Sequence, residues 1–278
     1  MKIGASYWMF EGGLEAKKPV GEAMQEAKDA GFESIELAIA SEGVLTENTT
    51  EAECEAILAT AEKVGIEISS VASGESWSYS PTANNPGVRQ RIIDFTKKAL
   101  WVAKWLGTDA YLFVPGAVDV FFLPDAEVIA YDVCYERAVE GIKQILATAE
   151  EAGVTLCIEN VWNKFLLSPL ETRDFIDGFS SERVGAYFDV GNVLLTGYPD
   201  QWIRILGERI KRVHIKDFKT SVGTVEGFVD LLEGNVDFEQ TKNALAEVGY
   251  DGYCTAEMLP YAPGRIEKTA EAMKKIFK

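Results

Sequence analysis

Short apolar runs alternate with longer amphipathic segments along the whole chain of 278 residues. In five places a charged amphipathic segment ends in a glycine, and a run rich in β-branched and aromatic residues follows; these glycines are Gly31, Gly65, Gly107, Gly153 and Gly249. Glycine just past a helix end closes the helix, and such runs predict strands. Residues 3–6, 186–188 and 213–215 form similar runs without that glycine. The pattern therefore predicts eight strands.

The segments between these strands have helical periodicity. In the first segment, Val20, Ala23, Met24, Ala27 and Ala30 fall on one face, and residues 133–149 show a similar pattern. Apolar strands that alternate with helices indicate a parallel sheet with a covered outer face. Eight such units without a break in composition predict an α/β fold, a single (β/α)8 TIM barrel domain over residues 1–278. A doubly wound sheet is the competitor, but no glycine-rich phosphate loop follows the first strand.

Three connections after strands are long, whereas the connections from helix back to strand are short. The long ones cover residues 73–86, 115–124 and 219–237 and follow strands three, four and seven. Barrel enzymes carry their chemistry on the connections at the carboxyl ends of the strands. The asymmetry predicts one site at that end.

Composition narrows the class of protein and its partners. A content of 47% hydrophobic and 26% charged residues is typical of a soluble globular protein. The net charge of −17 argues against nucleic acid or an anionic membrane as a partner, because both attract basic patches. No apolar stretch approaches the ~20 residues of a membrane span, and no secretory segment stands at the start. The four cysteines are far apart, which predicts buried free thiols and a cytoplasmic location.

The one histidine, His214, lies in a strand-like run at residues 211–217. Taken alone, such a histidine is more often a core imidazole than a ligand. Three other strand-like runs, however, end in a carboxylate: Glu159, Asp189 and Glu257. These residues belong to strands five, six and eight and His214 to strand seven, so the four strand tips are neighbours in a barrel. Alternation along the strand places Lys216 on the same face as His214.

Each of these residues also has a simpler interpretation. Glu159 can cap a loop, Asp189 can hold the turn at Gly191, and Glu257 can pair with Lys216. Three clustered carboxylates would repel one another and raise their own pKa values, and a divalent ion removes that conflict. Three oxygen ligands and one imidazole suit Mn²⁺ best, with Mg²⁺, Co²⁺ and Zn²⁺ as alternatives.

At these residues the chain resembles the xylose isomerase-like barrels, a superfamily of sugar and sugar-phosphate isomerases and epimerases. The motifs that carry the resemblance are Ile158-Glu159-Asn160, Asp189-Val190-Gly191-Asn192, His214-Ile215-Lys216-Asp217, Glu233-Gly234-Asn235-Val236-Asp237-Phe238 and Glu257. The resemblance implies that Glu159, Asp189, His214 and Glu257 bind the metal. It also implies that Glu159 and Glu257 flank the substrate carbon as a catalytic acid/base pair, as in ketose 3-epimerases.

The chemistry agrees with that role. A hydroxyl-bearing carbon next to a ketone loses its proton only if the resulting enediolate is stabilised, and a metal that chelates the two neighbouring oxygens stabilises it. One carboxylate then takes the proton from one face, and the other returns a proton to the opposite face. The expected activity is 3-epimerisation of a ketose or a ketose phosphate.

The chain departs from the epimerases of free ketoses at three places. Asn192 stands where that group has a histidine, Thr220 where it has an arginine, and Phe165-Leu166 where it has a second glutamate. The motifs are more similar to pentulose-5-phosphate 3-epimerases and to proteins assigned as hexulose-6-phosphate isomerases. A phosphorylated ketose is therefore the preferred expectation.

Several residues are candidates for contact with the substrate. Lys216, Lys219 and Lys164 are candidates for binding a phosphate, although each can also be an ordinary surface charge. Asn192 binds a substrate oxygen or stabilises its own turn. The expected hydrophobic wall for the sugar comprises Trp8, Trp77 and Trp162, and these tryptophans can equally be core of the barrel rim.

Other functions of the superfamily give the alternatives. A lyase of the same fold, an inosose-type dehydratase or a deglycosylating enzyme, begins with the same proton abstraction. A barrel that binds a sugar without turnover is the second alternative. The DNA-repair endonucleases of this fold need several histidines, and true xylose isomerases need a second metal site and a catalytic histidine. Relatives are often dimers or tetramers, so a homo-oligomer is expected as well.

Overall fold

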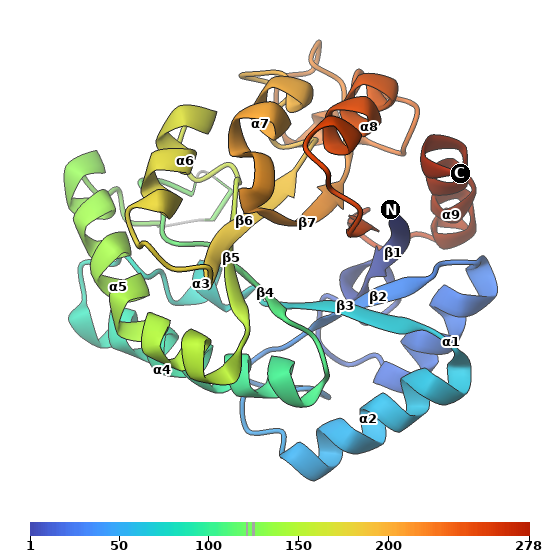
Figure 1. Ribbon diagram of the computed structural model, residues 1–278, viewed down its shortest axis with the longest axis horizontal. Helices are drawn as coiled ribbons and strands as arrows, with labels where there is room; N and C mark the ends of the chain where they lie inside the picture. Colours follow the sequence, from blue (N-terminus) through green and yellow to red (C-terminus); the bar gives the residue numbers. More distant parts are fainter. Residues whose placement is uncertain (121, 124–125) are drawn as a thin grey trace.

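The computed structural model describes residues 1–120, 122–123 and 126–278. Parallel strands close into a barrel in the order β1-β10-β7-β6-β5-β4-β3-β2, and helices surround it (Figure 1). The predicted (β/α)8 barrel is confirmed. The barrel strands are β1 Lys2–Ser6, β2 Ser34–Ala38, β3 Glu67–Ala72, β4 Ala110–Phe113, β5 Thr155–Glu159, β6 Val184–Asp189, β7 Ile210–Ile215 and β10 Tyr253–Ala256.

The long helices follow the predicted periodic segments, whereas the one-turn helix α3 lies in the predicted connection 73–86. Their bounds are α1 Val20–Ala30, α2 Glu51–Val64, α3 Glu75–Ser78, α4 Pro86–Trp105, α5 Tyr131–Ala152, α6 Pro169–Asp177, α7 Pro199–Leu206, α8 Phe238–Glu247 and α9 Arg265–Phe277. Gly31, Gly65 and Gly153 end α1, α2 and α5 with a left-handed backbone, as the recurring glycine predicts.

Alternate residues of the strands face two different cores. Val213 and Ile215 of β7 belong to the large core that also contains the inner faces of the helices. Cys157 and Tyr187 belong to a small cluster with residues of β3 and β4 inside the barrel. The alternation predicted for β5, β6 and β7 is confirmed, and it points Glu159, Asp189 and His214 into the barrel.

The connection after β7 contains structure that the sequence did not predict. The short strand β8 Asp217–Phe218 pairs antiparallel with β9 Phe228–Val229, and the 3-10 helix η3 Val225–Gly227 precedes β9. Runs of two residues are too short for periodicity to reveal, because alternation needs about four. In the predicted connection 115–124, residues 121 and 124 lie outside the described residues.

The cysteines are placed as the sequence predicts. Cys54, Cys134, Cys157 and Cys254 are all buried and free. Among the residues that the structure describes, no helix has both the length and the hydropathy needed to cross a membrane.

Candidate metal and active site

The structure brings the four predicted metal ligands together at the mouth of the barrel. Glu159 and Asp189 are the last residues of β5 and β6, His214 lies near the end of β7, and Glu257 directly follows β10. These strands are neighbours, and Asp189 and Thr255 pair with His214 in the register of the barrel. As a result, one potential ligand atom from each residue lies within 4.8 Å of all the others.

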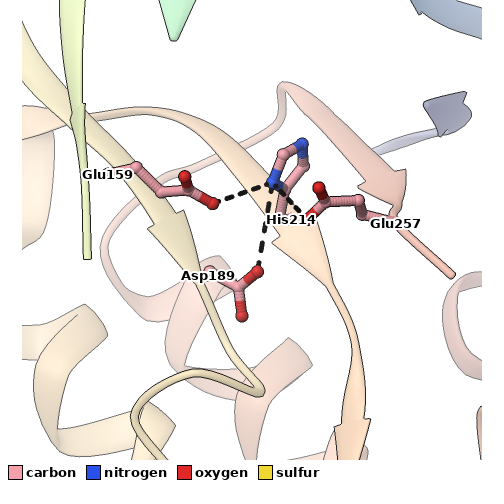
Figure 2. A group of neighbouring side chains, drawn as sticks. All are labelled: Glu159, Asp189, His214 and Glu257. Atoms are coloured by element: carbon pink, nitrogen blue, oxygen red, sulfur yellow. Dashed lines mark hydrogen bonds and ion pairs between the residues drawn. The ribbon is translucent and has the colours of Figure 1, made fainter. Parts of the chain in front are cut away.

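Three carboxylates face a single nitrogen of the imidazole. His214 Nδ1 lies 3.2 Å from Glu159 Oε1, 3.3 Å from Glu257 Oε2 and 3.9 Å from Asp189 Oδ2 (Figure 2). None of the four residues is more than 8% exposed. Because little water reaches these side chains, their charges interact strongly with one another.

The other imidazole nitrogen meets a fourth carboxylate, that of Glu36 on β2. His214 Nε2 lies 3.0 Å from Glu36 Oε1, and both side chains are fully buried. A carboxylate at this nitrogen favours a proton on Nε2, which leaves the Nδ1 lone pair directed at the cluster. Glu36 thus fixes both the orientation and the tautomer that a metal ligand needs.

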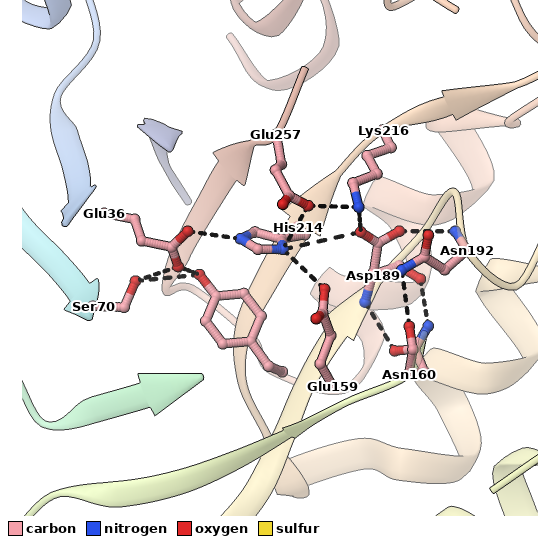
Figure 3. A network of polar contacts seen from close by, with 10 residues as sticks. Glu36, Ser70, Glu159, Asn160, Asp189, Asn192, His214, Lys216 and Glu257 are labelled. Carbon is pink, nitrogen blue, oxygen red and sulfur yellow. Dashed lines mark hydrogen bonds and ion pairs between the residues drawn. The ribbon is translucent and has the colours of Figure 1, made fainter. Parts of the chain in front are cut away.

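Two hydroxyl groups hold Glu36 in place. Glu36 Oε2 accepts hydrogen bonds from Ser70 Oγ at 3.0 Å and from the Tyr187 hydroxyl (Figure 3). Burial by itself would raise the pKa of Glu36, but His214 and these hydroxyls hold it below its usual value. Glu36 was not among the residues predicted from the sequence, although a glutamate between Ile35 and Leu37 in an apolar strand was a usable signal.

Lys216 bridges two of the candidate ligands. Its Nζ lies 2.5 Å from Glu257 Oε2 and 3.1 Å from Asp189 Oδ2. Burial alone would lower the pKa of Lys216, but Asp189 and Glu257 raise it above its usual value. Glu257 therefore pairs with Lys216, as its simpler interpretation predicts, and it also lies among the candidate metal ligands.

Two asparagines frame Asp189. The Asn160 side chain accepts from the Asp189 N–H at 2.9 Å and donates to the Asp189 carbonyl at 2.8 Å. The Asn192 N–H donates to Asp189 Oδ1 at 2.8 Å, and Asn192 Nδ2 donates to the Asn160 carbonyl at 3.0 Å. Asn192 therefore stabilises its turn, as one of its two interpretations predicts, and Oδ2 of Asp189 is left to face His214.

Burial and neighbouring charges shift the pKa values of Glu159 and His214. Burial raises the pKa of Glu159 to about 7, against the opposing influence of His214. Burial by itself would lower the pKa of His214, but Glu36 and Glu257 raise it well above its usual value. In the cluster, the ammonium of Lys216 lies beside the carboxylates of Asp189 and Glu257 and offsets part of their negative charge.

The donor set fits one divalent metal ion. Among the described residues, no aligned hydrogen-bond donor reaches Asp189 Oδ2 or Glu257 Oε2, although the ammonium of Lys216 lies within ion-pair distance of both. Buried carboxylate oxygens are costly unless they are paired or bind a metal. Carboxylate oxygens with one imidazole nitrogen match hard to borderline divalent ions. Glu159, Asp189, His214 and Glu257 can therefore hold such an ion.

A cavity of about 220 Å³ opens onto this cluster. Its walls include the predicted contact residues and two of the candidate ligands, namely Trp8, Trp77, Trp162, Asn192, Lys216, Glu159 and Glu257. Of the three lysines predicted for a phosphate, Lys216 lines the cavity, Lys164 Nζ lies 2.5 Å from Asp119 Oδ2, and Lys219 is exposed outside it. The cavity thus combines polar groups on its floor with aromatic walls.

Asp217 holds the connection between β7 and α8, which forms one side of the cavity, in place. Its carboxylate accepts from the Gly234 N–H at 2.8 Å and from the Val236 N–H at 3.1 Å. A Cβ at Gly234 would collide with that carboxylate, which explains a glycine in this motif. The same connection contributes Val225 and Phe228 to the cavity wall.

Three solved structures share the fold over nearly the whole chain. A D-tagatose 3-epimerase-like protein is 19% identical, with a TM-score of 0.79 over 99% of this chain and 97% of that one. D-Psicose 3-epimerase from Clostridium cellulolyticum H10 is 18% identical, with a TM-score of 0.78 over 99% and 98%. The 3-keto-D-glucoside 4-epimerase YcjR from E. coli is 15% identical, with a TM-score of 0.78 over 99% and 98%. At these identities the likeness shows the fold.

Sequence comparison gives the family. A protein of Methanocaldococcus jannaschii, MJ1311, is 23% identical over 184 residues, which are 64% of this chain and 60% of that protein. The match thus spans less than two thirds of that curated relative. The family model described as xylose isomerase-like TIM barrel matches residues 24–276, which include all four candidate ligands. The chain belongs to the xylose isomerase-like TIM barrel family.

Proposed function

We propose that this protein is a metal-dependent sugar epimerase that inverts a carbon next to the ketone of a ketose. The observation that carries the proposal is the placement of two buried glutamates around one candidate ligand atom. Glu159 at the end of β5 and Glu257 after β10 approach His214 Nδ1 at 3.2 Å and 3.3 Å (Figure 2). Both glutamates line the same cavity. Inversion requires two groups that exchange protons with one carbon from opposite faces, and this pair can supply them.

Residues of this chain would hold the ion and carry out both proton transfers. A divalent ion held by Glu159, Asp189, His214 and Glu257 would supply positive charge beside the ketone oxygen, which makes the neighbouring carbon more acidic. One glutamate accepts the proton from that carbon, and the other donates a proton to the opposite face. Because epimerisation is reversible, the two glutamates exchange these roles when the other epimer is bound.

The remaining cavity residues position the sugar. Lys216 presents an ammonium group next to Glu257, where it can donate to a substrate oxygen in addition to the carboxylate. Asn192 lines the cavity while it holds the turn after Asp189. Trp8 and Trp162 offer ring faces for the C–H groups of a sugar.

We propose Mn²⁺ as the ion, with Mg²⁺, Co²⁺ and Zn²⁺ as alternatives for an oxygen-rich site with one imidazole. We propose a ketose without phosphate as the better substrate, which revises the preference for a phosphorylated sugar. Lys164 is paired with Asp119, and Lys216 is paired with Glu257 and Asp189, so a phosphate would have to displace these partners. The epimerases of D-psicose and D-tagatose type among the structural neighbours support this choice.

The test is proton exchange with solvent. Protein loaded with Mn²⁺ is incubated with a panel of ketoses and ketose phosphates in D₂O, and the products are followed by NMR and mass spectrometry. We expect deuterium at the carbon next to the ketone and an inverted product. Glu159→Gln and Glu257→Gln should each slow exchange by roughly 100-fold or more, because each removes a proton-transfer group.

Glu62→Gln, an exposed change on α2, is the matched control and should exchange at the wild-type rate. An unsaturated or cleaved product would favour a lyase over an epimerase. Full exchange in both glutamine variants, or retention of bound metal in His214→Ala, would contradict the proposed site.

A further inference from the structure

A second cavity, of about 430 Å³, lies beside the metal cavity. Its lining comes mainly from the connections that follow β5 and β6, and Trp202 of α7 also belongs to it. Val161, Trp162 and Asn192 line both cavities. The two together fall within the roughly 300–1,000 Å³ that is typical of small-molecule sites.

The walls of the second cavity are mostly apolar. Its apolar lining side chains, apart from the shared residues, are Phe165, Leu166, Leu167, Val193, Leu195 and Trp202. The one cationic side chain in its described lining, Lys164, is paired with Asp119. This environment favours an uncharged, apolar group over a phosphate or a second hydrophilic sugar.

Hydrogen bonds and ring contacts hold this shape in place. Trp162 Nε1 donates to the Asn192 carbonyl at 2.8 Å, and the indole packs on Phe228 with ring centroids 5.2 Å apart. The buried Asn163 donates to the Gly116 carbonyl at 2.7 Å and accepts from the Phe165 N–H at 3.0 Å. These contacts hold Trp162, which lines both cavities, and the neighbouring Asn163 in place.

We propose that the second cavity binds an apolar aglycone, aromatic or branched aliphatic, while the sugar of the same substrate lies over the metal cavity. This inference rests on the proposed function and names its substrate class as a keto-sugar glycoside. Because Trp162 and Asn192 line both cavities, an apolar group in the second cavity lies next to a sugar in the metal cavity. A simple ketose fills only the metal cavity and leaves this apolar surface exposed to water.

Binding of unreactive glucosides tests the inference without turnover. Calorimetry on the Mn²⁺-loaded protein compares para-nitrophenyl β-D-glucoside with methyl β-D-glucoside and with glucose phosphate. We expect the nitrophenyl glucoside to bind at least about 10-fold more tightly than the methyl glucoside, because its ring is removed from water. The double variant Leu167→Ser/Leu195→Ser should abolish most of that preference and leave the affinity for Mn²⁺ unchanged.

Leu167 and Leu195 are 62% and 42% exposed, so their replacement should not disturb folding. Leu14→Ser, which removes a leucine that is 51% exposed outside the cavity, is the matched control. Equal affinity for the two glucosides, tighter binding of glucose phosphate, or an unaltered preference in the double variant would overturn the inference. So would a change from dimer to monomer in the double variant, because the apolar surface would then be a contact between copies of the chain.

The outcomes separate this inference from the proposed function. Preferential binding of the nitrophenyl glucoside without any deuterium exchange would retain the apolar subsite and reject the epimerase. Deuterium exchange with simple ketoses, without a preference between the glucosides, would retain the epimerase and reject the apolar subsite.

Discussion

The two nitrogens of the His214 imidazole face different partners, and this division defines the site at the residue scale. Nδ1 is surrounded by the carboxylates of Glu159, Asp189 and Glu257, whereas Nε2 is bound to Glu36. A ligating histidine whose other nitrogen donates to a carboxylate is held in one tautomer and is a stronger base toward the metal. Glu36 is therefore a positioning residue, which would act on a bound ion through His214.

This role predicts a loss of metal affinity in Glu36→Gln. The amide keeps the size of the side chain but removes its charge, so the proton on Nε2 loses its anionic acceptor. We expect the affinity for Mn²⁺ to fall by roughly 10- to 100-fold, as measured by calorimetry. Glu62→Gln should bind Mn²⁺ like the wild type, and an unchanged affinity in Glu36→Gln would show that Glu36 is only structural.

Replacing Lys216 should raise the affinity for Mn²⁺, in contrast to the loss expected for Glu36→Gln. Its ammonium stands between Glu257 and Asp189, so it neutralises the same oxygens that a metal would bind. Lys216→Met should destabilise the metal-free protein by about 3 kcal/mol, because removing one partner leaves buried charges behind. The same variant should bind Mn²⁺ more tightly, since the competing cation is gone.

Urea unfolding with chelator present and calorimetry with Mn²⁺ measure these two effects. Lys63→Met, an exposed change on α2, should alter neither quantity. Weaker metal binding in Lys216→Met would mean that the lysine supports the ion instead of competing with it.

At the scale of elements, the carboxylate of Asp217 links distant parts of the connection between β7 and α8. Asp217 accepts hydrogen bonds from the backbone at Gly234 and Val236, seventeen and nineteen residues further along the chain. The connection carries Val225 and Phe228 into the wall of the metal cavity. The order of this segment and the shape of the cavity are therefore coupled.

Asp217→Ala should loosen this connection without opening the barrel. We expect faster hydrogen exchange across residues 219–237 and a loss of about 1–3 kcal/mol of stability, because the N–H groups of Phe218, Gly234 and Val236 lose a charged acceptor. Exchange in β5 and β6 should stay as in the wild type. Glu239→Ala, at an exposed position of α8, is the control, and equal exchange in the two variants would contradict the role of Asp217.

At the scale of the whole molecule, a metal ion would connect four neighbouring strands of the closed barrel. An ion that binds only the folded state stabilises it by mass action, by about 2.7 kcal/mol at a concentration one hundred times the dissociation constant. Urea unfolding with and without Mn²⁺ should show this difference, and a chelator should reverse it. His214→Ala should unfold at the same urea concentration with or without Mn²⁺; a metal-dependent shift in that variant would place the binding elsewhere.

The features that were predictable from the sequence have short-range causes. The glycines that end α1, α2 and α5 and the alternation along β7 are set by neighbours within a few residues. Four polar residues at equivalent strand ends were visible for the same reason, since the barrel order follows from repeated βα units. The sequence did not predict the one-turn helix α3, the two-residue strands β8 and β9, or the role of Glu36.

The sequence by itself determined the eight barrel strands, their order and the residues at their tips, because these depend on local periodicity and on the handedness of βα units. Only the tertiary structure decided which side chains meet. Closure of the barrel brings Glu36 against His214 across 178 residues of sequence and sets Lys216 between two candidate ligands. It also places an apolar cavity beside the polar one. Such contacts depend on the curvature and register of the whole barrel, which no local pattern encodes.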